Sequence, residues 1–324
     1  MNKVVDGLIG FAIGDAMGVP IEFVPRERLL KHPVTKMLCF GTHNAPAGSW
    51  SDDTSMTIAT MDSFIEKHKF DYQDIMEKWY EWAVHYKYTP FNLRFDIGHT
   101  CFKAIYNYSK KNLEPLKCGL SDINSNGNGS LMRMLPVVYY GYYKNISGKK
   151  LYNLVKNISS LTHAHEISIL GCYIYVLYVI ELLKGKDKFE AYKLIQHKDY
   201  SMFSNDSLNV YKRILNQDIS LLKIDDIKSS GYVVDTLEAS LWVTLKSNNY
   251  KDSIIGTINL GNDTDTIGAI TGSISGILYS YDSIPKDWTN ALLKKDYLIE
   301  VANKFYNELN KKWLDIKYII IIWN

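Results

Sequence analysis

A stripe of three glycines inside a segment of helical periodicity restricts the fold of this chain more than any other feature. The segment reads NLGNDTDTIGAITGSISG, residues 259–276, and Gly268, Gly272 and Gly276 lie on one face of the expected helix. Each of these glycines costs the helix about 1 kcal/mol relative to alanine. Because a glycine face lets another backbone approach closely, we expect this helix to pack tightly on a second helix. Such packing would also fix the start of the helix, which matters if that start binds a ligand.

Apolar residues recur at helical spacing along most of the chain, whereas alternating strand patterns are scarce. The clearest helical segments are 4–12, 58–65, 75–82, 169–180, 237–245 and 298–309. A length of 324 residues would fit about two domains at roughly 150 residues each. We instead predict one all-α domain over 1–324. The polar segment 184–230 contains apolar residues, so we interpret it as a peripheral excursion of that domain and not as a linker between two domains. Residues 310–324 are expected to form a C-terminal tail.

Charge and cysteine content argue against several classes of function. The chain has 37 basic and 35 acidic residues, so no large charge attracts it to nucleic acid or to an anionic membrane. Its four cysteines lie far apart, which favours reduced thiols over a disulfide framework or a zinc site. Asp6 and Asp15 interrupt the N-terminal apolar stretch, which makes it a poor signal peptide. The apolar run YIIII at 318–322 is far shorter than the ~20 residues that span a bilayer. We expect a cytoplasmic monomer.

Two segments place several oxygen ligands at the expected start of a helix. They are SDDT, residues 51–54, and DTDT, residues 263–266. An aspartate at such a position is most often a helix cap or a partner of the helix dipole. Crowded carboxylates repel one another, however, unless a cation neutralises them. Both segments offer only hard oxygen donors, which suit Mg²⁺ or Mn²⁺ and argue against zinc or copper.

Seven motifs, taken in their order along the chain, make the sequence resemble the ADP-ribosylglycohydrolases of the dinitrogenase-reductase-activating type. They are GLIGFAIGDAMGVPIEF (7–23), GSWSDDTSM (48–56), DIGHT (96–100), NGNGSLMRMLPV (126–137), THAHE (162–166), GYVVDTLEASLW (231–242) and NLGNDTDTIGAITG (259–272). The resemblance extends from residue 7 to about 288. It implies a compact orthogonal bundle of helices with two Mg²⁺ or Mn²⁺ ions in a cleft.

The resemblance also implies roles for individual residues. The metal ligands would be Ser51, Asp52, Asp53, Asp263, Asp265 and Thr266. Ser51 stands where the family commonly has threonine, a change that keeps the hydroxyl but loosens its rotamer. The catalytic carboxylates would be Glu22, Asp53 and Asp96. Substrate contacts would come from a diphosphate loop, a histidine and an aromatic residue beside the adenine: Gly127, Asn128, Gly129, Ser130, His163 and Tyr232.

Each of these residues also has a plainer structural interpretation. The GNGS segment at 127–130 could be an ordinary Asn-Gly turn, and His163 could be a buried, hydrogen-bonded histidine. Tyr232 is one of 24 tyrosines, so only its motif distinguishes it. Glu22, which follows Pro20, could be a solvated loop carboxylate.

The functional hypothesis is a metal-dependent hydrolase that removes ADP-ribose from modified protein side chains or from a small molecule. The motifs DIGHT and GYVVDTLEASLW favour the N-glycosidic bond to arginine, and the O-linked bond to serine or an acyl group is the alternative. Three further readings stay open at this point. They are a two-metal phosphoryl hydrolase, a non-catalytic ADP-ribose-binding or crystallin-like protein, and an immunity protein against an ADP-ribosylating toxin.

Overall fold

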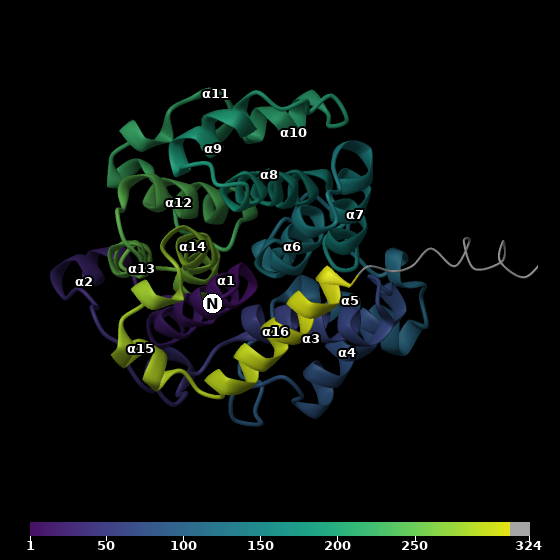
Figure 1. Cartoon of the computed structure of the whole chain (residues 1–324), viewed down its shortest axis with the longest axis horizontal. Helices are drawn as coiled ribbons and strands as arrows, with labels where there is room; N and C mark the ends of the chain where they lie inside the picture. Colours follow the sequence, from purple (N-terminus) through teal and green to yellow (C-terminus); the bar gives the residue numbers. More distant parts are fainter. Residues whose placement is uncertain (312–324) are drawn as a thin grey trace, which may run out of the picture.

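The two helices at the centre of the molecule are both striped with glycine. In the computed structural model, α1 (Lys3–Gly18) lies along α14 (Thr264–Tyr279), although they are separated by most of the chain (Figure 1). A methyl group at Gly10 would overlap the carbonyl oxygen of Gly272, and one at Gly14 would overlap that of Gly268. The expected close helix packing is therefore confirmed, and the partner helix carries a glycine stripe of its own.

The structure describes residues 1–311; residues 312–324, which hold most of the expected C-terminal tail, lie outside that part. Nearly all regular secondary structure of the described chain is helical, with β-pairing limited to isolated bridges, and the predicted all-α class is confirmed. The remaining α-helices are α2 (Arg26–Lys31), α3 (Asp52–Lys67), α4 (Tyr72–His85), α5 (His99–Lys111), α6 (Leu135–Tyr143), α7 (Gly148–Ser160), α8 (Glu166–Leu183), α9 (Lys188–Gln196), α10 (Asn205–Val210), α11 (Lys212–Asn216), α12 (Val233–Lys246), α13 (Tyr250–Ile258), α15 (Lys286–Ala291) and α16 (Lys295–Asn310). Short 3₁₀ turns connect them: Val19–Ile21, Gly41–His43, Pro115–Lys117, Asn128–Arg133, Ile219–Leu221, Ile224–Asp226 and Tyr281–Ser283.

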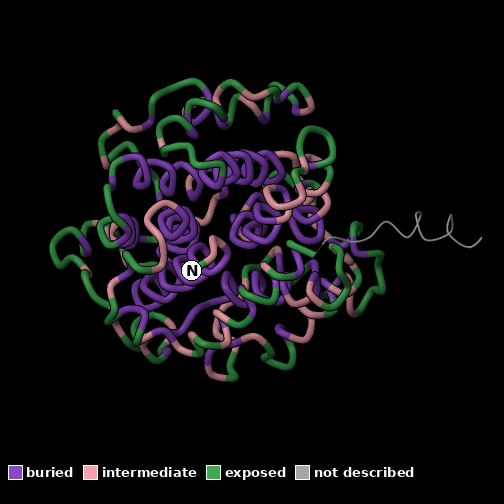
Figure 2. The backbone as a smooth tube through the Cα atoms, viewed as in Figure 1, coloured by how far each residue is buried: buried purple, intermediate pink, exposed green. Residues whose placement is uncertain are grey.

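Helices α1, α8 and α14 form the buried centre of the bundle (Figure 2). Segments 3–21 and 166–183 are apolar and long enough to cross a membrane, yet both are buried among other helices of the chain. Their apolar residues face protein on nearly every side, which explains why neither helix shows a polar face.

Segment 184–230 forms α9, α10, α11 and two 3₁₀ turns, and it lies on the outer side of α8 and α12 (Figure 1). The segment has buried side chains of its own, including Ile195, Tyr211 and Ile214. Trp242 of α12 donates from Nε1 to the carbonyl of Leu222 at 3.1 Å, which ties the segment to the bundle. The description of one domain over 1–324 stays a prediction.

Candidate functional site

The two acidic segments predicted from the sequence meet beside the start of helices α3 and α14. The Thr266 hydroxyl donates to Asp53 Oδ1 at 3.4 Å, across 213 positions of the sequence. Asp15, Asp53 and Asp265 each place a carboxylate oxygen within 4.8 Å of the other two. All three side chains are buried. The glycine packing explains this convergence, because Gly18 at the end of α1 lies directly against the backbone of Thr264 and Asp265.

The carboxylates at the start of α3 are not used as helix caps. Ser51 occupies the N-cap position, and its Oγ accepts from the Asp53 N–H at 3.3 Å. Asp15 reaches over from α1 and accepts from the N–H groups of Ser51 and Thr54, at 2.9 Å and 3.1 Å. Two free N–H groups of the first turn, those of Asp53 and Thr54, are thus satisfied by Ser51 and Asp15. The Asp52 and Asp53 carboxylates are left for another role.

Asp263 shows the same pattern at the start of α14. It occupies the N-cap position, but its side chain makes no capping hydrogen bond. Its Oδ2 instead accepts from the Asn128 side-chain amide at 3.1 Å. Two buried oxygens, Asp53 Oδ2 and Asp263 Oδ1, have no hydrogen-bond partner among the described residues. Buried polar atoms are rarely left unpaired, so these two oxygens suit the coordination of a cation.

Burial and mutual repulsion make these carboxylates costly to ionise. Burial, together with the charges of neighbouring carboxylates, raises the pKa of Asp52, Asp53 and Asp265 well above the ordinary value. Burial raises the pKa of Asp15 to about 7, although its hydrogen bonds from Ser51 and Thr54 oppose the shift. A cation bound among these groups would offset both effects. Because the donors are carboxylate and hydroxyl oxygens, the residues present fit a hard divalent ion such as Mg²⁺ or Mn²⁺.

A pocket of 350 Å³ opens beside the acidic cluster. The predicted site residues that line it are Glu22, Asp52, Asp53, Asp96, Gly127, Asn128, Gly129, His163, Asp263 and Thr266. Four other predicted residues, Ser51, Asp265, Ser130 and Tyr232, are not among its lining residues. A larger cavity of 590 Å³ lies between α7 and α8 and contains none of the predicted residues.

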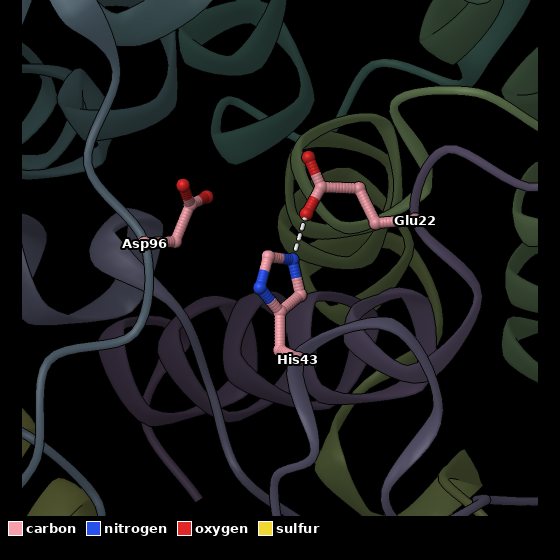
Figure 3. Close-up of side chains that lie close together, drawn as sticks. All are labelled: Glu22, His43 and Asp96. Carbon is pink, nitrogen blue, oxygen red and sulfur yellow. Dashed lines mark hydrogen bonds and ion pairs between the residues drawn. The ribbon is translucent and has the colours of Figure 1, made fainter.

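Glu22, His43 and Asp96 form a second polar group at this pocket (Figure 3). One ligand atom from each residue lies within 4.8 Å of the others, and His43 Nε2 is hydrogen-bonded to Glu22 Oε2. Burial raises the pKa of Glu22 to about 7, with the His43 hydrogen bond opposing the shift. His43 and Asp15 were not identified from the sequence. Asp15 gave one available signal, since an aspartate inside an apolar helix needs a partner. His43 lies at the end of the short 3₁₀ turn Gly41–His43 and gave none.

The comparison with known families agrees with this geometry. The family model described as ADP-ribosylglycohydrolase matches residues 1–314. The chain belongs to the ADP-ribosylglycohydrolase family. It is therefore a hydrolytic enzyme, and the resemblance inferred from its motifs is confirmed.

Several relatives of this glycohydrolase cover nearly all of the chain. It is 30% identical over 309 residues to the ADP-ribosylarginine hydrolase Tri1 of Serratia proteamaculans, covering 94% of this chain and 79% of the relative. Identity to the ADP-ribosyl-[dinitrogen reductase] glycohydrolase of Rhodospirillum rubrum is 28%, with 90% of each chain covered. Human ADP-ribosylhydrolase ARH3 is 24% identical, with 76% of each chain covered. A solved structure titled ADP-ribosylglycohydrolase-related protein complex has the same fold, with a TM-score of 0.79, 24% identity, and 95% and 98% of the two chains covered.

The GNGS segment at 127–130 is hydrogen-bonded to the start of α12. Asn128 N–H donates to the Gly231 carbonyl at 2.9 Å, and Val233 N–H donates to the Asn126 carbonyl at 3.0 Å. These bonds place Tyr232 at the N-cap position of α12, next to the loop. The Ser130 side chain faces the core, with its Oγ 3.3 Å from the Cys172 sulfur. Any contact of Ser130 with a ligand would therefore come from its backbone.

A buried arginine, Arg133, positions His163 through the hydroxyl group of Thr162. Arg133 Nη2 donates to the Thr162 hydroxyl at 2.6 Å, and that hydroxyl lies 2.6 Å from His163 Nδ1. Burial, helped by the charge of Arg133, lowers the pKa of His163 to about 3, so the imidazole is neutral near pH 7. Arg133 also lies 4.3 Å from the centre of the Trp79 ring. Arg133 and Thr162 were missed from the sequence, because their contacts join distant segments.

Proposed function

We propose that this glycohydrolase uses two Mg²⁺ or Mn²⁺ ions to hydrolyse the bond between C1″ of ADP-ribose and an arginine side chain of a modified protein. The observation that carries the proposal is the convergence of two acidic helix starts with the buried, unpartnered oxygens of Asp53 and Asp263. The ligands would be Ser51, Asp52, Asp53, Asp263, Asp265 and Thr266, with Asp15 as a further candidate that adjoins Asp53 and Asp265. When bound, such ions supply a template for vicinal hydroxyls and polarise a water molecule.

The protein's own residues supply the proton transfers and the charge stabilisation. Cleavage at C1″ builds oxocarbenium character, which the carboxylates of this pocket stabilise. Glu22, with its pKa near 7, can hold or release a proton close to neutral pH, and His43 orients its carboxylate. Asp96, on the other side of His43, is the candidate acidic partner that keeps the guanidinium protonated, so that it leaves C1″ as a neutral guanidine (Figure 3). The neutral His163 and the loop at 127–130 would bind the diphosphate, and Tyr232 would pack beside the adenine.

Arginine is proposed as the acceptor on the strength of the relatives. The ADP-ribosylarginine hydrolase Tri1 of Serratia proteamaculans is 30% identical to this chain, whereas human ARH3 is 24% identical. Removal of ADP-ribose from serine is the alternative. We place the reaction in the cytoplasm.

The test is hydrolysis of arginine-linked and serine-linked ADP-ribosyl peptides, with added Mg²⁺ or Mn²⁺ and with EDTA. We expect free ADP-ribose from the arginine-linked peptide, and only in the presence of metal. Turnover of the serine-linked peptide alone would overturn the acceptor. Equal turnover in EDTA would overturn the metal requirement, and release of inorganic phosphate would indicate a phosphoryl hydrolase.

A further inference from the structure

Phe23 is an exposed aromatic residue at the mouth of the catalytic pocket. It lines the pocket beside Glu22, yet 65% of its surface is exposed. Its φ angle of 62° lies in the left-handed region, which bulky residues rarely adopt. The backbone there is held in place, because Phe23 N–H donates to the Asn262 carbonyl at 2.6 Å and Asn262 N–H donates to the Val24 carbonyl at 2.9 Å. A strained backbone that exposes an apolar ring next to a catalytic pocket needs an explanation.

The Phe23 ring belongs to a row of aromatic rings along this edge of the pocket. Its centre lies 6.1 Å from that of His43, and His43 lies 5.2 Å from Phe95. Phe95 in turn stacks on Phe91 at 5.8 Å with nearly parallel planes. Phe23 is the ring of this row that lines the pocket, next to Glu22.

Two carboxylates make the same edge of the pocket acidic. Glu22 and Asp96 place their carboxylates on two sides of the His43 ring (Figure 3). None of the described residues that line the pocket is a lysine or an arginine. Aromatic faces together with carboxylates are the surroundings that a planar cation prefers.

We propose that Phe23 forms an acceptor subsite that binds the guanidinium group of the modified arginine and so determines acceptor specificity. This inference rests on the proposed glycohydrolase function and names a determinant of its substrate class. A guanidinium group gains both a π contact with Phe23 and attraction from Glu22 and Asp96. A serine-linked substrate has no cation at this position and gains neither.

The test compares Phe23→Leu, which keeps apolar bulk but removes the π face, with Phe23→Tyr, which keeps the π face. For the arginine-linked peptide, Phe23→Leu should lower kcat/KM about 3- to 30-fold, the factor expected for one lost cation–π contact. Phe23→Tyr should stay within about twofold of the unchanged protein, on the same reasoning. The serine-linked rate should change much less than the arginine-linked rate in Phe23→Leu. Phe189→Leu is the matched control, because Phe189 is 53% exposed and does not line the pocket.

Two more readouts separate the outcomes. Agmatine, a free alkylguanidinium, should compete with the arginine-linked peptide, and its inhibition constant should rise in Phe23→Leu by a similar factor. ADP-ribose affinity, measured by calorimetry, and the helical circular dichroism spectrum report on the rest of the site. An unchanged arginine rate, or equal losses for both peptides, in Phe23→Leu would overturn the subsite while leaving the proposed function intact. If the unchanged protein does not hydrolyse the arginine-linked peptide, both proposals fail.

Discussion

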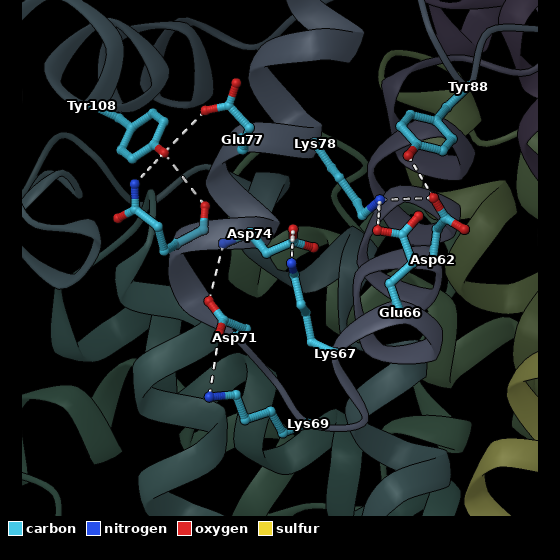
Figure 4. A network of polar contacts seen from close by, with 11 residues as sticks. Asp62, Glu66, Lys67, Lys69, Asp71, Asp74, Glu77, Lys78, Tyr88 and Tyr108 are labelled. Carbon is cyan, nitrogen blue, oxygen red and sulfur yellow. Dashed lines mark hydrogen bonds and ion pairs between the residues drawn. The ribbon is translucent and has the colours of Figure 1, made fainter.

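Helix α3 carries two pairs of carboxylates in opposite surroundings. Near its C-terminal end, Lys78 lies 3.0 Å from both Asp62 and Glu66, and the Tyr88 hydroxyl donates to Asp62 at 2.7 Å (Figure 4). At its start, Asp52 and Asp53 form no ion pair with any lysine or arginine that the structure describes, and both are buried.

This difference separates a structural acidic pair from a functional one. Where carboxylates only connect α3 to α4, the chain provides its own lysines: Lys67 pairs with Asp74 at 3.3 Å in the same network (Figure 4). At the start of α3 the chain instead adds a further buried carboxylate, Asp15, and no basic side chain pairs with it in the described structure. The neutralising charge at that end is therefore expected from outside the chain.

The largest effect should come from removing a carboxylate at the start of the acidic helices. We expect Asp265→Ala and Asp52→Ala each to lower kcat/KM by at least about 100-fold, because even outer-shell partners of metal ligands cost 10–100-fold. The helical circular dichroism spectrum should be retained. Asp62→Ala, at the other end of α3, should leave turnover unchanged. If all three variants behave alike, the distinction between the two pairs is wrong.

A second effect concerns the glycine packing that brings the helix starts together. Gly272→Ala would force a methyl group into the backbone of α1 at Gly10. We expect a loss of about 1–3 kcal/mol in the free energy of unfolding, or more, because the contact is with backbone that cannot rotate away. Urea unfolding measures it. Gly256→Ala in α13 is the control, because its methyl group would meet only the side-chain atom Val243 Cγ1, at 3.3 Å. At this position helix propensity alone would favour alanine by up to about 1 kcal/mol.

The glycine stripe also shows how much of the fold could be predicted from the sequence. Local patterns predicted the helices, the close packing at Gly268, Gly272 and Gly276, and the two acidic helix starts. They could not pair α14 with α1, because nothing local relates segments separated by most of the chain. Asp15, His43 and Arg133 were missed for the same reason, since each acts through a residue from another part of the fold.

The pH dependence of stability should differ between the metal-free and the metal-bound protein. Burial raises the pKa of Asp15 and Glu22 to about 7 in the folded protein, whereas the unfolded chain releases these protons near the ordinary values. The folded state therefore binds more protons between about pH 4 and pH 7, and the free energy of unfolding should fall as the pH rises through that range. The loss should be on the order of 1 kcal/mol or more per group.

Urea unfolding in EDTA across this pH range checks the sign. The profile of Asp15→Asn should be flatter, because its amide has no proton to release. With saturating Mg²⁺ the decline should disappear, since the cation takes the place of the protons. A metal-free protein whose stability rises steadily from pH 4 to pH 7 would contradict the raised pKa of these two carboxylates.

The smallest effect should come from the lysine-paired end of α3. Lys78→Met removes a partner shared by Asp62 and Glu66, and we expect it to cost no more than about 1 kcal/mol, as is usual for ion pairs near the surface. Thermal unfolding at low and high salt measures it, with turnover recorded alongside. A loss of activity in Lys78→Met would show that this end of the helix also serves the site.

The most direct test of the account is a Mn²⁺ titration of the metal-free protein, followed by electron paramagnetic resonance, in which free Mn²⁺ gives the signal. The account predicts that the protein removes two Mn²⁺ ions per chain from the free pool. It also predicts that Asp53→Asn and Asp265→Asn lose this binding while Asp62→Asn keeps it. Binding that is absent from the unchanged protein, or that survives in all three variants, would contradict the claim that the acidic helix starts form a metal site.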